Sequence, residues 1–335
     1  MADATVVDAA PIAPADPRLC APAAWHERVR AARCAAVVVH FRDADETLAC
    51  VASLRAHAPQ VPVLVVDNDG AAAPQLALAR LATGDGHTAL LVCGANLGFG
   101  GGCNAGFDAL LAVGPALAHV LLLNPDARAT AGMVEHLCAT AAAHPDAGIV
   151  GGRILSPDGT RVQFENGRLR PFSLSRMHCR APAADRAFAT TFVTGALMLV
   201  DADMLRGGLR FDPRFFLYVE DLDLCCEVRA RRRSLWIDPR AVAHHRGGGC
   251  WRTDRAVLGA LTPGQVYWLA RSKILFAAKR STTLQRWVHL ALATLVKPLV
   301  GLAIARSARF WAPHFRGIRD GLRQLRALRL TRGAT

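Results

Sequence analysis

The sequence predicts an α/β fold built on a parallel β-sheet that carries helices on both faces. From residue 37 to residue 143, short apolar runs alternate with longer amphipathic stretches. Buried parallel strands typically read as continuous runs of about five apolar residues, whereas amphipathic helices show a period near 3.6 residues. Glycine-rich or acidic segments follow several of the runs, at the sheet edge where such folds bind ligands.

The expected elements alternate regularly in the first half of the chain. Strands are predicted at residues 37–41, 61–67, 89–93 and 119–123. Helices are predicted after them, at 46–57, 74–82, 103–113 and about 131–143. The first helix has the clearest pattern, because Leu48, Val51 and Leu54 share one face. Beyond residue 150 the alternation weakens, and only strands at 192–200 and 235–237 and a helix at about 222–233 are expected.

The C-terminal part is expected to be helical from Val266 onward and is strongly basic. From Arg271 to Thr335 there are 14 Lys and Arg against one acid, Asp320, so this part accounts for the whole net charge of +13. Its apolar runs, 287–296 and 299–304, are separated by a Lys-Pro pair, and neither reaches the ~20 residues of a membrane span. A neutral body with a basic end points to an anionic surface and argues against a nucleic-acid-binding core.

Three regions are predicted from these patterns. Residues 1–33 are interpreted as a flexible lead-in, 34–265 as the catalytic domain, and 266–335 as a helical basic tail that associates with a membrane. The first residues lack a basic segment followed by an apolar run, so no secretory signal is expected and the protein is predicted to be cytoplasmic.

The ten cysteines are scattered and include no CxxC pair. Cys225 and Cys226 are adjacent, a spacing that seldom suits a disulfide or a zinc site. Buried thiols in a reducing compartment are the expected outcome.

The glycine-rich stretch NLGFGGGCNAGF, residues 96–107, comes after the third predicted strand. Glycines allow a backbone to approach a ligand closely, and a helix that follows offers free N–H groups to a phosphate. Gly100, Gly102 and Ala105 also form a GxGxxA pattern, but a dinucleotide fingerprint should follow the first strand. A tight strand-to-helix turn without a ligand remains the alternative.

Acids and histidines after later strands supply the candidate chemistry. In LLLNPDA, Asp126 emerges directly from a strand, as a ligand of Mg²⁺ or Mn²⁺ on a diphosphate would, although an Asp after Pro is more often part of a turn or a helix cap. In FDPRFFLYVEDLDLCCEVR, three acids occupy four positions, and such a group needs a cation, a helix N-terminus or a substrate hydroxyl to compensate it. The AHHRGGGC segment offers a metal ligand, a phosphate-binding loop or simply a surface histidine.

Taken in this order, the segments resemble those of the family 2 glycosyltransferases, particularly the rhamnosyltransferase-like branch. The resemblance covers about residues 35–280 and rests on VVVHFRDADETLACVASL, VPVLVVDND, NLGFGGGCNAGF, LLLNPDA, VTGALMLV, FDPRFFLYVEDLDLC, AVAHH and VYWLARSKILFAAK. It implies a GT-A fold and an inverting transfer of a sugar, rhamnose or a related hexose. The donor would be a nucleotide sugar, and the acceptor a lipid-linked or cell-surface glycan.

The resemblance also implies roles for individual residues. Base and ribose would lie near Val39, His40, Asp67 and Asn68, and the nucleotide-sugar pocket near Asn96, Gly98 and Asn104. Asp126 and His244, with His245 as the alternative to the latter, would hold Mg²⁺ or Mn²⁺. Asp221, in the pair with Glu220, would be the general base, and Asp223 would contact substrate.

Several positions depart from the family pattern. His40-Phe41 replaces the usual Asn-Tyr, and Cys250 stands where a Ser often occurs. Glu227 takes a position that is commonly Arg, and Arg232 one that is commonly Gly.

The basic tail favours attachment to the inner face of the cell membrane. Arg316, Arg319 and Arg323 recur at helical spacing with apolar residues between them, which suits the headgroup region. Each basic residue near an anionic leaflet contributes ~1 kcal/mol. A solvated charged face is the simpler alternative.

Two other functions were weighed against sugar transfer. A sugar nucleotidyltransferase would share the nucleotide-binding start, but the expected glycine-rich first loop is absent from residues 40–43. A non-enzymatic scaffold that binds a membrane or nucleic acid would use the basic tail, but it leaves Asp126, Glu220 and Asp221 without a role.

Overall fold

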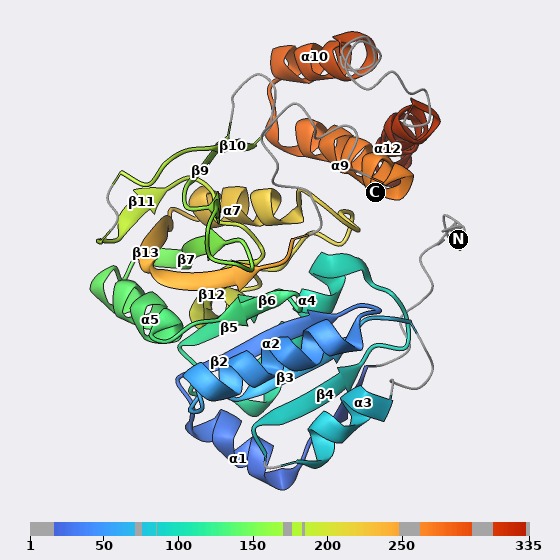
Figure 1. Cartoon of the computed structure of the whole chain (residues 1–335). Coiled ribbons are helices and arrows are strands. Elements are labelled where there is room, and N and C mark those ends of the chain that lie inside the picture. Colours follow the sequence, from blue (N-terminus) through green and yellow to red (C-terminus); the bar gives the residue numbers. More distant parts are fainter. Residues whose placement is uncertain are drawn as a thin grey trace.

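A mixed β-sheet with helices on both faces runs through the described part of the chain (Figure 1). The computed structural model describes residues 17–70, 76–84, 86–169, 176–182, 185–247, 262–296 and 311–332. The main sheet has 11 strands, in the order β1-β4-β3-β2-β5-β12-β7-β13-β11, with β6 paired to β13 and β8 paired to β7. A separate two-stranded sheet consists of β9 (Gly167–Leu169) and β10 (Arg176–His178).

The four predicted strands of the first half are confirmed and are parallel to one another. They are β2 (Cys34–His40), β3 (Val63–Asp67), β4 (Thr88–Val92) and β5 (His119–Leu123). The helices between them are α2 (Ala44–His57), the short α3 (Leu76–Ala79) with a 3₁₀ turn (Arg80–Thr83), and α4 (Gly98–Val113). Almost every residue of the four strands is buried, as their apolar composition requires.

The second half departs from the all-parallel pattern. β12 (Leu197–Asp201) lies between β5 and β7 (Ala147–Leu155) and is antiparallel to both, whereas β13 (Ser234–His245) is parallel to β7. Short strands β6 (Ala127–Ala129), β8 (Val162–Phe164) and β11 (Phe188–Thr190) complete the sheet. The helices here are α5 (Met133–Ala143), α6 (Ala202–Arg206) and α7 (Glu220–Ala230).

β13 is much longer than the predicted 235–237. Its register shifts between Asp238 and Val242, where a Pro-Arg pair interrupts the apolar run. The interruption hides the second half of the strand from a pattern based on apolar residues. That second half matters, because it carries His244 and His245.

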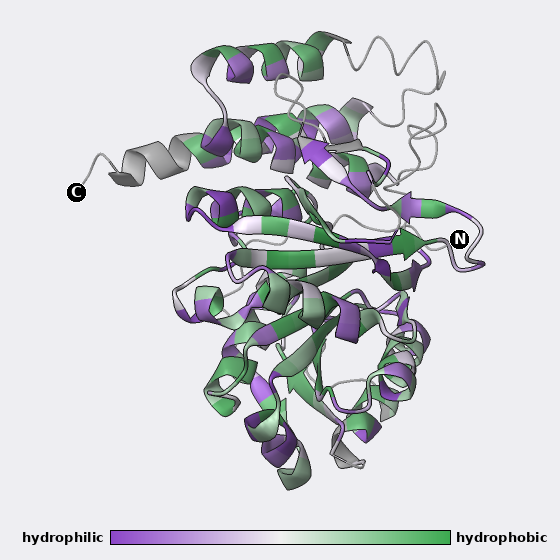
Figure 2. Ribbon diagram, turned by 90° about the vertical axis from the view of Figure 1, so that its left-hand side faces the viewer, coloured by the Kyte–Doolittle hydropathy of each residue, from purple (hydrophilic) through white to green (hydrophobic). Residues whose placement is uncertain are grey.

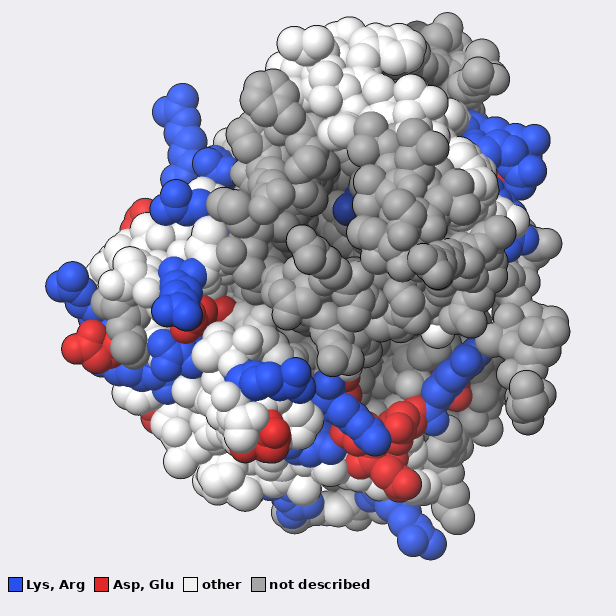
Figure 3. Space-filling model, turned by 45° about the horizontal axis from the view of Figure 1, so that its top comes forward, with Lys and Arg blue, Asp and Glu red and all other residues white. Residues whose placement is uncertain are grey.

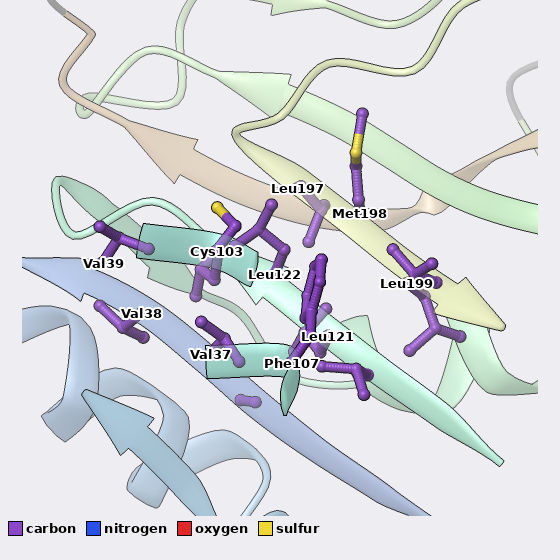
Figure 4. Packing of buried hydrophobic residues seen from close by; sticks show 14 of the residues in the cluster. Val37, Val38, Val39, Cys103, Phe107, Leu121, Leu122, Leu197, Met198 and Leu199 are labelled. Atoms are coloured by element: carbon purple, nitrogen blue, oxygen red, sulfur yellow. The ribbon is translucent and has the colours of Figure 1, made fainter. Parts of the chain in front are cut away.

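The core lies between the sheet and α4. Cys103 and Phe107 of α4 pack against β2, β5 and β12 (Figure 4). Added Cβ atoms at Gly102 and Gly106 would come within 2.8 Å of Val39 and Val37. These glycines therefore let the helix approach the sheet closely, so the glycine-rich stretch serves helix packing as well as the turn.

The prediction of a flexible lead-in over residues 1–33 is wrong for its second half. Arg18–Cys20 form β1, which pairs with β4, and Ala23–Ala31 form α1. Trp25 of α1 is fully buried, and its indole N–H donates to the carbonyl of Val63 at 3.0 Å. The alanine-rich sequence gave no periodic signal, and one tryptophan anchors the helix. Residues 1–16 lie outside the described part.

The C-terminal part forms helices, and the first of them belongs to the body of the protein. α9 (Pro263–Arg280), α10 (Thr283–Ala291) with a short π-helical turn (Leu292–Val296), and α12 (Trp311–Arg332) form a layer above α7 (Figure 1). Phe276 of α9 is fully buried in the main core. A domain boundary at residue 266 is therefore wrong, because α9 begins earlier and packs into the core.

α12 packs closely on α9 through two small residues. A Cβ at Gly317 would lie 2.4 Å from the carbonyl of Tyr267, and one at Gly321 would lie 3.0 Å from Ile274.

Among the described residues, no helix combines the length and the apolar character needed to cross a bilayer.

Candidate active site

One carboxylate of the site lies where β5 ends. Asp126 follows β5, and the pairing of β6 with β13 places His245 opposite Ala127. The Nε2 atom of His245 lies 2.9 Å from one carboxylate oxygen of Asp126, and the N–H of Gly247 donates to the other oxygen at 3.1 Å. The main-chain carbonyl of Asp126 also accepts from the N–H of Arg246. The last residue of β13 and the two residues after it thus contact Asp126 through its main chain and its carboxylate.

The surroundings keep Asp126 ionised. Burial by itself raises the pKa of its carboxyl group. The hydrogen bond and charge of His245 and the N–H of Gly247 lower that pKa by more than burial raises it, so the net shift is downward. Asn124 also contacts the His245 ring, with its Nδ2 atom 3.2 Å from Nε2. Nδ1 of His245 is buried without a hydrogen-bond partner among the described residues.

His244, the histidine first expected at the metal, contacts a different element. Its Nδ1 lies 3.2 Å from the carbonyl of Pro157, and its ring is within 3.5 Å of a Cβ placed on Gly159. Adjacent residues of a strand point to opposite faces, so only one of the two histidines can contact Asp126. The alternative, His245, is the one that does.

Asp126 and His245 are spaced like two neighbouring ligands of one divalent cation. Ligand atoms ~2.1 Å from an octahedral ion lie about 3 Å apart when they are neighbours. The 2.9 Å between the carboxylate oxygen and Nε2 matches that spacing. No group of three or more His, Cys, Asp or Glu side chains suited to a metal occurs among the described residues, so the described part of the chain offers this pair alone. A cavity of about 220 Å³ adjoins the pair and is also lined by Glu46, Arg128 and His244.

The second carboxylate lies at the start of α7. Asp221 is 6% exposed; one of its oxygens accepts from the N–H of Leu222 at 2.8 Å and the other from the N–H of Gly195 at 3.3 Å. Tyr218 and Val219, just before the helix, both have positive φ, 66° and 71°. Such backbone is costly for a β-branched residue, and strain of this kind concentrates at functional sites.

The two acids are linked through the turn that precedes β12. The N–H of Asn124 donates to the carbonyl of Ala196 at 3.1 Å, because β5 ends where β12 begins. Gly195, the residue before Ala196, holds Asp221, and Asp126 is two residues beyond Asn124. The turn that enters β12 therefore contacts Asp221 directly and reaches Asn124, two residues before Asp126.

The other two acids of the segment differ in their contacts. Asp223 accepts from Lys279 Nζ and from Arg280 Nε, each at 2.7 Å, so both of its oxygens tie α7 to α9. This pairing gives Asp223 a structural role between the two helices, and its contact with substrate stays a prediction. Glu220 is 6% exposed in the first turn of α7, beside Asp221.

Two departures from the family pattern have structural explanations. Glu227 accepts from Arg280 at 2.9 Å and from Arg231 at 3.3 Å, so α9 and the end of α7 compensate its charge. Arg232 has φ 58°, the left-handed conformation that explains a glycine at this position in relatives. Cys250 lies outside the described residues.

Some of the predicted nucleotide-binding residues form one hydrogen-bonded group. The Asn68 amide donates to the carbonyl of Gly98 at 3.1 Å and accepts from the N–H of Leu97 at 2.9 Å. The Asn96 side chain accepts from the N–H of Gly98 at 2.9 Å. The Asp67 side chain is 3% exposed and accepts a hydrogen bond from the main-chain N–H of Asp69. Asn68 and Asn96 thus shape the turn that starts α4.

Three other predicted residues are engaged in packing. The Asn104 side-chain amide makes two hydrogen bonds with the main chain of Phe211. It donates to the carbonyl and accepts from the N–H, both at 2.9 Å. Val39 packs against Gly102. His40 is fully buried, with Nδ1 2.8 Å from the Thr47 hydroxyl, and its Nε2 has no hydrogen-bond partner among the described residues.

Burial lowers the pKa of His40, although nearby carboxylates, Asp67 foremost, act in the opposite direction. His40 is therefore neutral near pH 7. Burial also raises the pKa of Cys50 to about 12 and that of Cys93 to about 11. Both thiols stay protonated, so neither is a nucleophile for a covalent intermediate.

α9 supports the loop before Asp221, a role that the sequence did not reveal. Arg271 donates to the carbonyl of Arg214 at 3.1 Å, and the Ser272 hydroxyl donates to the carbonyl of Leu217 at 2.8 Å. Trp268 stacks on Phe216 with ring centroids 4.4 Å apart. Ser272 is fully buried, and a buried hydroxyl needs a hydrogen-bond partner, so a serine just before the apolar run 274–278 is the signal that could have indicated such a contact.

Comparisons with solved structures agree on the fold. A crystal structure of GalNAc-T7 with UDP, GalNAc and Mn²⁺ superposes with a TM-score of 0.54 at 12% identity, covering 74% of this chain and 50% of that one. The mannosyltransferase PcManGT from Pyrobaculum calidifontis, in complex with GDP-Man and Mn²⁺, gives 0.51 at 14% identity, covering 85% and 84%. These similarities confirm the predicted GT-A fold.

Sequence comparison identifies the family. The N-acetylglucosaminyl-diphospho-decaprenol L-rhamnosyltransferase of Mycobacterium tuberculosis, in two strains, is 29% identical over 228 residues, which are 60% of this chain and 71% of that protein. A sequence model described as Glycosyl transferase family 2 matches residues 34–208, slightly more than half of the chain. Asp221 and His245 lie beyond that match, so their assignment depends on the geometry above. The chain belongs to glycosyltransferase family 2 and is a rhamnosyltransferase-like member of it.

Proposed function

We propose that this glycosyltransferase moves a deoxyhexose or hexose, with L-rhamnose as the first candidate, from a nucleotide sugar to a lipid-linked diphosphate glycan. The relative from Mycobacterium tuberculosis, whose name specifies L-rhamnosyl transfer to N-acetylglucosaminyl-diphospho-decaprenol, supports both substrate classes. The observation that carries the proposal is the approach of Asp126 and Asp221 to the same turn before β12.

The proposed mechanism is a single displacement with inversion. Asp221 removes the proton from the acceptor hydroxyl, and the oxygen forms a bond to the anomeric carbon of the donor. The bond from that carbon to the diphosphate breaks on the opposite face, and the nucleoside diphosphate leaves with the electron pair. The N–H groups of Gly195 and Leu222 hold the Asp221 carboxylate in position for this step.

Asp126 and His245 are proposed to hold Mg²⁺ or Mn²⁺ beside the donor diphosphate. The ligand spacing fits, and the two solved structures described above contain Mn²⁺. When bound, the cation neutralises charge on the leaving diphosphate. We propose His245 in place of His244, because only His245 contacts Asp126.

Two substitutions separate the roles. Asp221→Asn should abolish release of nucleoside diphosphate in the presence of acceptor and leave Mn²⁺-dependent donor binding intact. Asp126→Asn should weaken donor binding in calorimetry. Asp203→Asn, whose side chain is 88% exposed, is the matched control and should behave as wild type. Full turnover by Asp221→Asn would refute the assignment of the base.

The family membership favours sugar transfer over nucleotidyl transfer. The two reactions give different products: exchange of pyrophosphate into a nucleoside triphosphate would indicate a nucleotidyltransferase, whereas release of nucleoside diphosphate indicates sugar transfer. The same preparation can be assayed for both.

We further propose that the C-terminal helices attach the enzyme to the cytoplasmic face of an anionic membrane. Leu284 and Trp287 of α10 are 67% and 65% exposed, and Arg316, Arg319 and Arg323 of α12 are exposed in the same layer of helices. Apolar and basic side chains together suit the headgroup region. Figure 3 shows Lys and Arg side chains around the edge of this face.

Substitution tests membrane attachment more cleanly than deletion, because α12 packs on α9 and its removal would uncover the core. Leu284→Ser with Trp287→Ser should reduce co-sedimentation with vesicles that contain anionic lipid. Val162→Ser, at a 52% exposed site in β8, is the control. Unchanged sedimentation of the double variant would contradict attachment through α10.

A further inference from the structure

A groove of about 910 Å³ lies between the three C-terminal helices. Its walls are apolar and include Ile274 and Leu275 of α9, Leu290 of α10, and Leu322 and Leu325 of α12. The volume is in the range of pockets that hold small organic ligands, about 300–1,000 Å³. Figure 2 shows hydrophobic residues interspersed with hydrophilic ones along these helices.

The groove connects the surface with the loop that leads to the proposed base. At its outer side, Trp287 is 65% and Leu322 is 37% exposed. At its inner side it is lined by Arg214 and Phe215, which belong to the loop before α7. That loop reaches Asp221 six residues later. A ligand in the groove would therefore contact the exposed side chains of α10 and α12 and also the loop that precedes Asp221.

The charges that line the groove favour an anion. The described residues that line it include three cations and no carboxylate. Two of the cations are already paired, because Arg214 and Lys279 both donate to Asp212. Arg286 differs, since it has no carboxylate partner among the described residues. Its only hydrogen bond there runs from a terminal nitrogen to the carbonyl of Ala278 at 3.1 Å, and its Nε is buried without a partner.

We propose that this groove binds the isoprenoid chain of the lipid-linked acceptor, with Arg286 at the diphosphate. The inference rests on the proposed function and adds to it the place where the lipid lies. An isoprenoid diphosphate combines the two properties that the groove shows, a long apolar body and an anionic end. Burial of the chain against the leucine and isoleucine side chains favours binding by the hydrophobic effect, and a guanidinium forms strong paired hydrogen bonds with phosphate oxygens.

The test uses soluble acceptors without vesicles, so that attachment to a membrane cannot contribute. Two N-acetylglucosaminyl diphosphates are compared, one with a farnesyl tail and one with a methyl group. Wild type should show a KM at least about tenfold lower for the farnesyl acceptor. Ala278→Trp, which fills the groove, should remove this preference and keep kcat with the methyl acceptor. Ala139→Trp, on the exposed face of α5, is the matched control.

Arg286→Gln provides a second variant that keeps the groove open. It should raise KM for both diphosphate acceptors and leave the KM for the donor unchanged, and Arg286→Lys should restore part of the loss. Binding is measured directly through quenching of Trp287 fluorescence by farnesyl diphosphate, with Trp287→Phe as the blank.

The outcomes distinguish the two proposals. Turnover with the methyl acceptor but no preference for farnesyl, or an equal preference in Ala278→Trp, would overturn the groove assignment and leave the proposed function standing. Failure to use either acceptor, with quenching by farnesyl diphosphate that Ala278→Trp abolishes, would contradict the acceptor class and retain a prenyl-diphosphate site. Absence of quenching would overturn the site itself.

Discussion

Replacing Gly98 by alanine tests how the start of α4 is joined to the loop that carries the proposed base. Gly98 has φ +75°, and an added Cβ would lie 2.2 Å from the carbonyl oxygen of Phe216. The same oxygen accepts from the N–H of Phe99 at 3.1 Å. An alanine must therefore adopt a left-handed conformation and push the Phe216 segment away by about 1 Å, since ordinary contacts need about 3.2 Å or more.

The cost follows from two terms. The left-handed conformation costs a non-glycine residue roughly 1–2 kcal/mol. Loss of the hydrogen bond between Phe99 and Phe216 adds about 0.5–1.5 kcal/mol. We expect the variant to lose about 2–3 kcal/mol in the free energy of unfolding, and its Tm to fall by roughly 3–4 °C for a chain of this length. We also expect kcat to fall, because Phe216 is five residues before Asp221.

Gly208→Ala is the matched control. Gly208 has φ +80°, but an added Cβ there would meet nothing within 4 Å. It should lose only the roughly 1–2 kcal/mol of the conformational term and keep full activity. Urea denaturation and turnover of both variants separate strain from the steric contact. If Gly98→Ala matched Gly208→Ala in stability and in kcat, the link between the glycine turn and the loop of Asp221 would be refuted.

Three further predictions concern single positions. Arg232→Gly should stabilise the protein by about 0.5–1 kcal/mol in urea denaturation, because it relieves a left-handed conformation at the expense of chain entropy. A loss of stability would show that contacts of the Arg232 side chain contribute more than the strain of its backbone costs. Asn104→Ala leaves the buried N–H and carbonyl of Phe211 unpaired and should cost about 1–3 kcal/mol, visible as a lower Tm. The folded state lowers the pKa of His40 below its usual 6.5, so the unfolded state binds more protons, and wild type should lose stability as pH falls below about 6.5. His40→Asn should flatten that part of the curve of Tm against pH, and identical curves would argue against a buried neutral histidine.

The sequence by itself predicted the parallel half of the sheet and singled out the acids of the candidate site. Four buried strands are visible as apolar runs because each is covered on both faces, so that local composition reports tertiary burial. Asp126 and the acids around Asp221 stood out because carboxylates directly after buried segments are unusual. The family resemblance assigned the reaction class, which the comparisons confirmed.

Tertiary structure alone decided which neighbours share a contact. Whether His244 or His245 contacts Asp126 depends on the register of β13 against β6, and a shift of one residue would exchange the two. For Asn104 and Asp223, which the resemblance assigns to substrate, the fold adds protein partners: the first binds the main chain of Phe211 and the second binds α9. These partners lie more than 50 residues away along the chain. A local pattern records the chemistry that a side chain offers, and only the folded chain determines which group receives it.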